Sequence, residues 1–380
     1  MPPAMDLQQQ LAGPERIGPE RVGQVVNLVL VEAVKKSASD VHFEPTHRAL
    51  EIRFRLDGVL HTVATLNREI AANIVARLKV LAELLTYRLD VPQEGRLVDA
   101  IKSFGVEMRV STFPTIHGEK AAVRIFDPAP RTLDLDQLGL APAVLAPLKE
   151  MLKQRSGAIL LTGPSGSGKT TTIYACLRHL IGKGGRHIVT IEDPVEQVIE
   201  GASQSHARSG TEFDFARGLR SLLRQDPEVI MIGEVRDRET AGIAIEAALT
   251  GHLVFSTLHA GSACGVIGRL LAMGVETYLL TSGLRGILNQ RLVRRLCPAC
   301  RQAGCSQCAG TGYQGRMLLG ELLTLEPPLR EAILAHSDTA TLEATASKLG
   351  EPTLRDMAEQ AARDGLTSHE EIERVLGPKG

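Results

Sequence analysis

The sequence predicts an α/β protein with a parallel, doubly wound sheet, preceded by a small α+β domain. After residue 140, the apolar runs AILLTG, HIVTIED, VIMIGE and LVFSTLH alternate with helical patterns. Such runs are typical of parallel strands that are buried on both faces. Before residue 128, apolar and charged residues alternate in EIRFRLDG, as they do in a half-exposed strand. The length of 380 residues exceeds one typical core, which favours two or three domains.

The order of elements predicts the domain boundaries. Residues 1–20 are polar and contain Pro and Gly, so we predict a flexible tail there. The small domain over 21–127 combines helical periods in RVGQVVNLVLVEAVKKSASD and EIAANIVARLKVLAELL with strands in VEMRVSTFPT and EKAAVRIF. A linker with two prolines spans 128–139, and the larger domain spans 140–380. Its last part, 325–380, is helical in PPLREAILAH, ATLEATASKL, TLRDMAEQAARDG and HEEIERVL.

The composition is that of a soluble globular protein and argues against several partners. The formal charge is −1, so no overall field attracts nucleic acid or an anionic membrane. Trp is absent and aromatic residues make up 3%, which leaves little for base stacking. The first residues lack a basic region followed by an apolar run, and no apolar stretch reaches the ~20 residues of a membrane span. We therefore expect a cytoplasmic chain without a specific nucleic-acid partner.

A phosphate-binding loop is predicted in GPSGSGKTT, which follows an apolar strand and precedes a helix. The alternative is a turn that is merely rich in Gly and Ser. In the phosphate-loop interpretation, backbone N–H groups and the helix N-terminus surround phosphate oxygens. Lys169 then bridges the β- and γ-phosphates of ATP, and the Thr170 hydroxyl binds Mg²⁺. The expected nucleotide-binding residues are Gly163, Pro164, Ser165, Gly166, Ser167, Gly168, Lys169, Thr170 and Thr171.

Acidic residues follow two of the predicted strands. HIVTIEDPVE ends in Glu192, Asp193 and Glu196, and VIMIGE ends in Glu234, the position of a metal-orienting acid. Both strands end at the carboxyl edge of the sheet, where ligands bind in doubly wound folds. The alternative for each acid is a solvated turn or a helix cap.

Two histidines flank a further strand, GHLVFSTLHA. A single histidine there is more often a packing or hydrogen-bonding residue than a catalyst. The presence of both His252 and His259 favours a sensor of the γ-phosphate over a general base.

Four of the six cysteines form two CxxC pairs four residues apart: Cys297, Cys300, Cys305 and Cys308. Two such turns supply the four thiolates of a closed structural Zn²⁺ site. A disulfide suits an extracellular chain, a redox pair needs one CxxC at a helix start, and an iron–sulfur cluster has no electron-transfer context here. Cys176 and Cys264 stand alone in apolar contexts and are expected to be buried.

The order and spacing of the motifs resemble those of the secretion ATPases of type II secretion and type IV pilus assembly (the GspE/PulE/PilB group). The resemblance covers residues 21–380 and rests on SASDVHFEP with RFRLDGVL, GPSGSGKT, TIEDPVE, DPEVIMIGEVRDRETA, TGHLVFSTLH, and QRLVRRLCPAC with GYQGR. It implies a PAS-like N-terminal domain joined by a flexible linker to a RecA-like ATPase domain that assembles into a homo-hexamer.

The resemblance also implies roles for single residues. Glu196 corresponds to the glutamate that activates water, Glu234 to the Walker B acid that acts through Mg²⁺, and His252 and His259 to the histidine box. Arg109 and Arg124 match arginines that reach nucleotide phosphates; alternatively, they are outward-facing strand charges.

The function implied is a cytoplasmic ATPase that powers pseudopilus or pilus assembly. It would associate with the inner membrane through a platform or anchoring protein. The cysteine pairs favour this assembly class over a pilus retraction or DNA-uptake motor, and we interpret their short spacer as a zinc-stapled docking loop. A nucleic-acid translocase and a scaffold that binds nucleotide without hydrolysing it are the other function classes.

Overall fold

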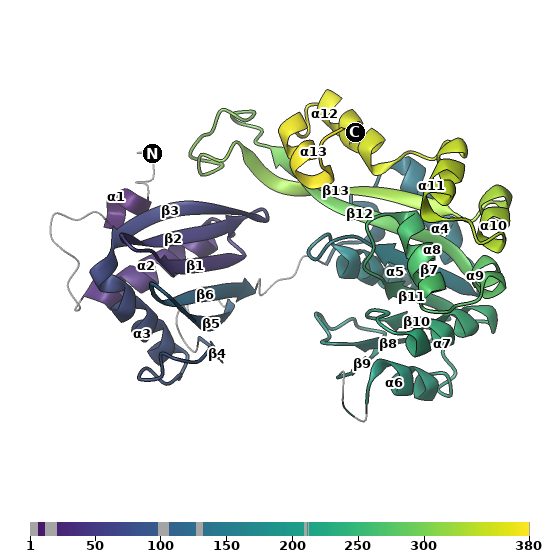
Figure 1. The fold of residues 1–380 in the computed structure, drawn as a ribbon, viewed down its shortest axis with the longest axis horizontal. Coiled ribbons are helices and arrows are strands. Elements are labelled where there is room, and N and C mark those ends of the chain that lie inside the picture. The colour runs from purple at the N-terminus through teal and green to yellow at the C-terminus, as the bar shows by residue number, and fades with distance from the viewer. Residues whose placement is uncertain are drawn as a thin grey trace. The chain divides into compact units, whose positions relative to one another are not determined.

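The computed structural model describes residues 7–11, 21–97, 106–126, 132–208, 211 and 213–379 of the chain. Their contacts divide the protein into two compact units (Figure 1). Unit 1 comprises Met1–Pro130 and Cys297–Gly315, and unit 2 comprises Arg131–Leu296 and Arg316–Gly380. The segment with the four cysteines therefore groups with residues of the N-terminal part.

Unit 1 contains a six-stranded sheet of order β3-β2-β1-β6-β5-β4. Its strands are β1 (Asp40–Pro45), β2 (Ala49–Leu56), β3 (Val59–Asn67), β4 (Gln93–Arg96), β5 (Glu107–Thr115) and β6 (Gly118–Phe126). Helices α2 (Val22–Lys35) and α3 (Ala71–Leu81) share one hydrophobic core with the sheet (Figure 1). The alternation in EIRFRL correctly predicted β2, whose Ile52, Phe54 and Leu56 are buried.

Four elements of unit 1 were not predicted, one of which is the short β4, whose residues QEGR include no apolar side chain. Strands β1 and β3 were missed because β1 follows directly after the polar turn that ends α2, and β3 has irregular burial. Within the tail predicted over 1–20, residues Leu7–Leu11 instead form helix α1. Leu7 and Leu11 are one helical turn apart, and both side chains are buried against the core. The other residues of the predicted tail lie outside the described part of the chain.

Unit 2 is built on a seven-stranded sheet of order β13-β12-β7-β11-β10-β8-β9. The strands β12, β7, β11, β10, β8 and β9 pair in parallel, which confirms the predicted α/β fold class. The bounds are β7 (Gly157–Thr162), β8 (Ile188–Glu192), β9 (Ser203–His206), β10 (Val229–Ile232), β11 (Leu253–Thr257), β12 (Leu284–Leu296) and β13 (Tyr313–Thr324). β12 and β13 were not predicted because charged residues interrupt their apolar runs.

Helices cover both faces of this sheet, as a doubly wound fold requires (Figure 1). Ile159 and Leu161 of β7 pack in one core with α4 (Pro142–Leu152) and α5 (Lys169–Lys183). Ala158 and Leu160 of the same strand pack in a second core. That core includes α6 (Phe215–Leu222), α7 (Arg238–Leu249), α8 (Ala263–Ala272) and α9 (Thr277–Gly283).

The predicted C-terminal helical region is confirmed. It consists of α10 (Pro327–Leu334), α11 (Thr339–Lys348), α12 (Leu354–Arg363) and α13 (His369–Leu376). No helix in the described ranges is both long enough and apolar enough to cross a membrane.

The linker predicted over 128–139 falls partly outside the described residues, which resume at 132. Its described part is packed onto unit 2, since Leu135 and Leu138 are buried in the same core as α5. Arg178 of α5 donates a hydrogen bond to the Leu133 carbonyl at 2.8 Å. Residues 132–139 are therefore packed in unit 2 and do not form a loose chain, although the prolines of 128–139 suggested a linker.

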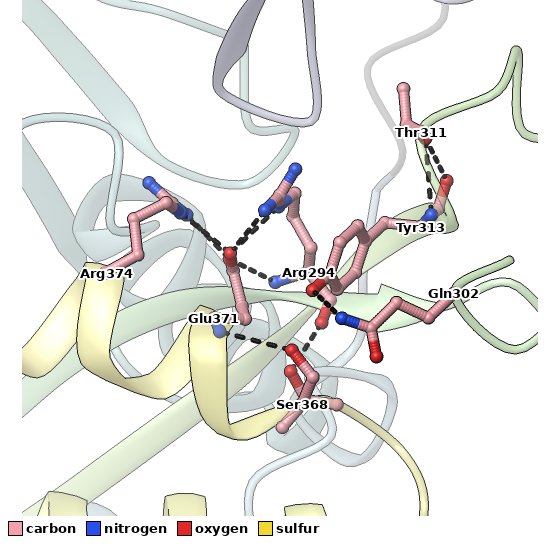
Figure 2. A network of polar contacts seen from close by, with 8 residues as sticks. Arg294, Gln302, Thr311, Tyr313, Ser368, Glu371 and Arg374 are labelled. Carbon is pink, nitrogen blue, oxygen red and sulfur yellow. Dashed lines mark hydrogen bonds and ion pairs between the residues drawn. The ribbon is translucent and has the colours of Figure 1, made fainter. Parts of the chain in front are cut away.

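A buried carboxylate fastens the last helix to β12. The Glu371 side chain is 0% exposed and accepts hydrogen bonds from the Arg294 backbone N–H at 2.9 Å and from the Arg294 Nε at 2.9 Å (Figure 2). Arg374 donates to the same carboxylate at 2.7 and 2.6 Å. Burial raises the pKa of Glu371, but the two arginines outweigh it and hold that pKa below its ordinary value.

We predict that Glu371→Gln lowers the free energy of unfolding of the protein by about 3 kcal/mol at pH 7, because it removes one charge of a buried ion pair. A carboxyl with a lowered pKa stabilises the fold above its unfolded pKa and loses this effect as pH falls through the folded value. The difference from wild type should therefore shrink below pH ~4.5. Denaturant unfolding at several pH values measures this, with the exposed Glu373→Gln on the same helix as control. An equal loss in both variants would contradict it.

Candidate nucleotide and metal sites

The phosphate loop is held between a buried strand and a helix. Every residue of β7 is buried, and α5 begins at Lys169. Gly168, which caps the helix, has φ = 89°, a left-handed conformation that favours glycine. At Gly163, a Cβ atom would lie 2.4 Å from the Gln290 carbonyl oxygen, so a side chain does not fit. The two glycines thus allow the loop to pass close to β12 and turn into the helix.

Lys169 lies within the loop rather than in solvent. Its ammonium group donates hydrogen bonds to the carbonyl oxygens of Gly163 at 2.9 Å and Pro164 at 3.0 Å. Burial is the main cause of its lowered pKa, and Arg291 adds to the shift, whereas Glu234 and Glu196 act in the opposite direction. Glu234 and Glu196 therefore each lie within electrostatic reach of Lys169.

The chemistry of the loop fits a nucleotide phosphate chain with Mg²⁺. Ser167 Oγ is buried and has no hydrogen-bond partner among the described residues, so it can bind a further polar group. Thr170 is partly exposed at the first turn of α5, where its hydroxyl can bind a cation beside the loop. Backbone N–H groups, a lysine and a helix N-terminus are the groups that bind phosphate in this type of loop.

Glu234 follows β10 by two residues at the same edge of the sheet. The backbone on both sides of it is fixed: Gly233 N–H donates to the Ile191 carbonyl at 2.8 Å, and Val235 N–H donates to the Thr257 carbonyl at 2.9 Å. Its carboxylate forms an ion pair with Arg236 and lies 3.9 Å from His259 Nε2. The structure thus brings the predicted Walker B acid and one of the two histidines together.

Glu196 is exposed four residues beyond the end of β8. Its backbone N–H donates to the Tyr174 hydroxyl on α5 at 3.3 Å. Tyr174 was not among the residues that the sequence suggested. The pattern marks it only as an apolar position of a helix, and its contact with Glu196 is visible only in the folded chain.

The two histidines lie at opposite ends of β11. His259 follows the strand on the side of the phosphate loop, whereas His252 precedes it beside Gly157, the first residue of β7. His252 Nδ1 makes a 2.9 Å hydrogen bond with the Ala247 carbonyl. Within unit 2, His252 is therefore not near Lys169, Glu196 or Glu234.

Arg109 and Arg124 are directly paired across β5 and β6 of unit 1, and both are exposed. Their guanidinium carbons lie 4.9 and 5.8 Å from the centre of the Phe126 ring. Arg109 also forms an ion pair with Glu107 at 3.1 Å. The two arginines thus form one cationic patch on the face of the sheet that carries Phe126.

The four cysteines form one cluster, in which all four Sγ atoms lie within 4.8 Å of one another. The Sγ–Sγ distance is 3.8 Å for Cys297–Cys305 and 3.7 Å for both Cys300–Cys308 and Cys305–Cys308. A tetrahedron of sulfurs at the Zn–S bond length has edges of roughly 3.8 Å. A disulfide requires about 2.05 Å, so the distances fit zinc and exclude disulfides.

The environment of Cys308 favours a thiolate. Burial alone would raise its pKa, but hydrogen bonds from the backbone N–H groups of Cys305 and Gly312, each 3.2 Å long, lower the pKa of Cys308 to about 6. Burial raises the pKa of Cys176 and of Cys264 to about 12. As predicted, these two are buried, and their thiols remain protonated at neutral pH.

Comparison with known proteins gives consistent matches over most of the chain. Residues 16–374 match the family model described as type II/IV secretion system protein. Type II secretion system protein E of Klebsiella pneumoniae is 43% identical, over 93% of this chain and 75% of the relative. Type II secretion system ATPase E of Vibrio cholerae is 41% identical, with the same coverage.

Solved structures with the same fold are also known. The pilus retraction motor PilT with bound ADP is 27% identical, has a TM-score of 0.61, and aligns over 92% of this chain and 96% of its own. The ATPase DotB of Legionella pneumophila has a TM-score of 0.66 at 22% identity, over 96% of this chain and 97% of its own. These structures confirm the RecA-like ATPase fold class.

We predict that the purified protein contains about one zinc ion per chain, and that Cys305→Ser/Cys308→Ser removes it because two of four thiolates are lost. Inductively coupled plasma mass spectrometry measures the metal directly. The control is Cys176→Ala/Cys264→Ala, which removes two cysteines outside the cluster and should keep the metal. Equal zinc content in both double variants would refute the assignment.

Proposed function

We propose a function from one premise, which is that this chain belongs to the type II/IV secretion system protein family. The protein is an ATPase that hydrolyses ATP to ADP and phosphate and powers assembly of a pseudopilus or pilus in type II protein secretion. Relatives named type II secretion system ATPase E and protein E support the proposed role in type II secretion. The phosphate loop supports ATP as the proposed substrate.

The observation that carries the hydrolysis proposal is a shared edge of the sheet: Glu196 follows β8 by four residues, Glu234 follows β10 by two, and Lys169 begins α5 after β7. In this proposal, the loop and Lys169 bind the phosphates, and Thr170 with Glu234 holds Mg²⁺, which neutralises charge on the phosphates. Glu196 is exposed and therefore able to orient and deprotonate a water molecule. We assign the sensing of the γ-phosphate to His259, which lies 3.9 Å from Glu234. We leave His252 out of this site because it lies at the other end of β11.

We also propose that Arg109 and Arg124 bring positive charge to the nucleotide phosphates when unit 1 moves. Two exposed guanidinium groups side by side form a site for an anion such as a nucleotide phosphate. If a homo-hexamer forms, domain motion in unit 1 would couple the arrival of this charge to hydrolysis. We further propose that the zinc-bound cysteine loop docks the protein on an inner-membrane platform or anchoring partner, which would place a cytoplasmic motor at the membrane.

We predict that Glu196→Gln lowers kcat for ATP by about 100-fold or more, because it removes the general base. It should leave nucleotide affinity nearly unchanged. Lys169→Ala should instead abolish nucleotide binding, because it removes the cation within the loop. Phosphate release and the fluorescence of a labelled ATP analogue measure the two properties.

The matched control for Glu196→Gln is Glu200→Gln, an exposed glutamate four residues further along the chain. If the wild type binds ATP but does not turn it over, even as an assembled oligomer with its partner, the chain is a nucleotide-dependent scaffold. Turnover that requires DNA and falls steeply with salt would instead identify a nucleic-acid translocase.

A separate prediction concerns the arginines of unit 1. Arg109→Ala should lower kcat by roughly tenfold or more, because a guanidinium that stabilises phosphate charge is lost. Arg88→Ala is the matched control: both side chains are about half exposed, at 53% and 47%, and both are ion-paired, with Glu107 and Asp90. Equal kcat values for the two variants, measured with the same phosphate-release assay, would show that Arg109 is only an outward-facing strand charge.

A further inference from the structure

A buried polar network lies beneath the segment that carries Glu196. Its centre is Glu192, the last residue of β8, which is only 2% exposed. The carboxylate accepts a hydrogen bond from the Tyr174 hydroxyl on one oxygen. The other oxygen accepts from Thr190 Oγ1 at 2.5 Å and from Gln204 Nε2 at 3.1 Å. Glu192 is therefore satisfied inside the protein and does not face the solvent.

Tyr174 links this carboxylate to the backbone of Glu196. Because its single hydroxyl proton is donated to Glu192, the hydroxyl oxygen is left to accept, and it does so from Glu196 N–H at 3.3 Å. Burial and then Glu192 raise the pKa of Tyr174 well above its ordinary value, so the hydroxyl stays protonated at neutral pH. The direction of the two hydrogen bonds is thus fixed.

Gln204 of β9 braces the residues that follow Glu196. Besides donating to Glu192, its Nε2 donates to the Gln197 carbonyl at 3.1 Å. Its Oε1 accepts from Ile199 N–H at 2.6 Å. The segment that carries Glu196 is therefore held both at its own N–H group, by Tyr174, and just beyond it, by Gln204.

The position of Tyr174 connects this network to the phosphate loop. Tyr174 and Lys169 both belong to α5, five residues apart, which corresponds to about 7.5 Å along a helix. One rigid helix therefore carries the phosphate-binding lysine at its start and the hydrogen-bond acceptor for Glu196 less than two turns later. A shift of Glu196 relative to the loop requires this hydrogen bond to break.

We propose that Tyr174 and Glu192 are positioning residues, which fix the backbone of Glu196 at a set distance from the bound phosphates. This proposal rests on the function proposed above, in which Glu196 activates water. A packing role alone does not explain the network, because a phenylalanine would fill the Tyr174 site without a buried hydroxyl. A buried carboxylate is costly unless every one of its hydrogen bonds is made.

The experiment compares two substitutions that each remove one donor to Glu192. Tyr174→Phe also removes the acceptor for Glu196 N–H, whereas Thr190→Val removes only a donor to the other oxygen of Glu192 and keeps the side-chain shape. Tyr174→Phe should lower kcat for ATP about tenfold, with KM changed less than about twofold. Thr190→Val should keep kcat close to that of the wild type.

A double-mutant cycle separates positioning from a general loss of structure. If Tyr174 acts through Glu196, Tyr174→Phe should cost almost no further activity in the Glu196→Gln background. An equal fall in kcat for Tyr174→Phe and Thr190→Val, or full additivity with Glu196→Gln, would overturn the proposal. An exposed tyrosine, Tyr278→Phe, controls for the loss of a hydroxyl as such.

If Tyr174→Phe does not fold, Glu192→Gln takes its place. The new amide donates to the Tyr174 hydroxyl, which turns the hydroxyl proton toward Glu196 N–H and removes the same hydrogen bond. Wild-type kcat in Glu192→Gln would then overturn the proposal. A wild type that does not hydrolyse ATP would refute the proposed function. An active wild type with unaffected variants would refute only the positioning role.

Discussion

The parallel pairing of β7, β11, β10 and β8 is the constraint on which the nucleotide site depends. The register places Leu161 beside Thr257, and it places Ile232 beside both Ser256 and Ile191. The carboxyl ends of the four strands therefore meet at one edge, although they lie up to 95 residues apart, from Thr162 to Thr257. Because the strands are buried on both faces, none of them can slip along its neighbour without exposing apolar side chains.

The sequence contains enough information to predict this edge of the sheet but not the hydrogen bonds between the residues that meet there. Unbroken apolar runs identified β7, β8, β10 and β11, and the glycines, lysine and threonine identified the phosphate loop. β12 and β13 were missed because their polar side chains, such as the buried Asn289 and Gln290, break the apolar pattern. The hydrogen bond between Glu196 and Tyr174 joins residues 22 positions apart, and no local pattern encodes it.

The four-cysteine cluster was more predictable than the arrangement of the candidate nucleotide site for a physical reason. A closed zinc site needs only four thiolates in two short turns, so its geometry is encoded within the 12 residues from Cys297 to Cys308. Sequence spacing could not show that these residues group with the N-terminal part rather than with unit 2. Within unit 1, Gly315 N–H donates to the Asp57 carboxylate at 2.8 Å, a contact between segments 258 residues apart.

The anion-binding role proposed for the exposed arginines of unit 1 follows from how the two side chains are placed. Arg109 and Arg124 are direct cross-strand neighbours, and like charges in this arrangement destabilise a sheet. Glu107 neutralises only part of this charge, and Phe126 stabilises both guanidinium groups through its ring face. The remaining repulsion between the two guanidinium groups does not stabilise the strand pair. In the function proposed above, a nucleotide phosphate would offset this repulsion. In that proposal, the same repulsion would couple movement of unit 1 to nucleotide binding.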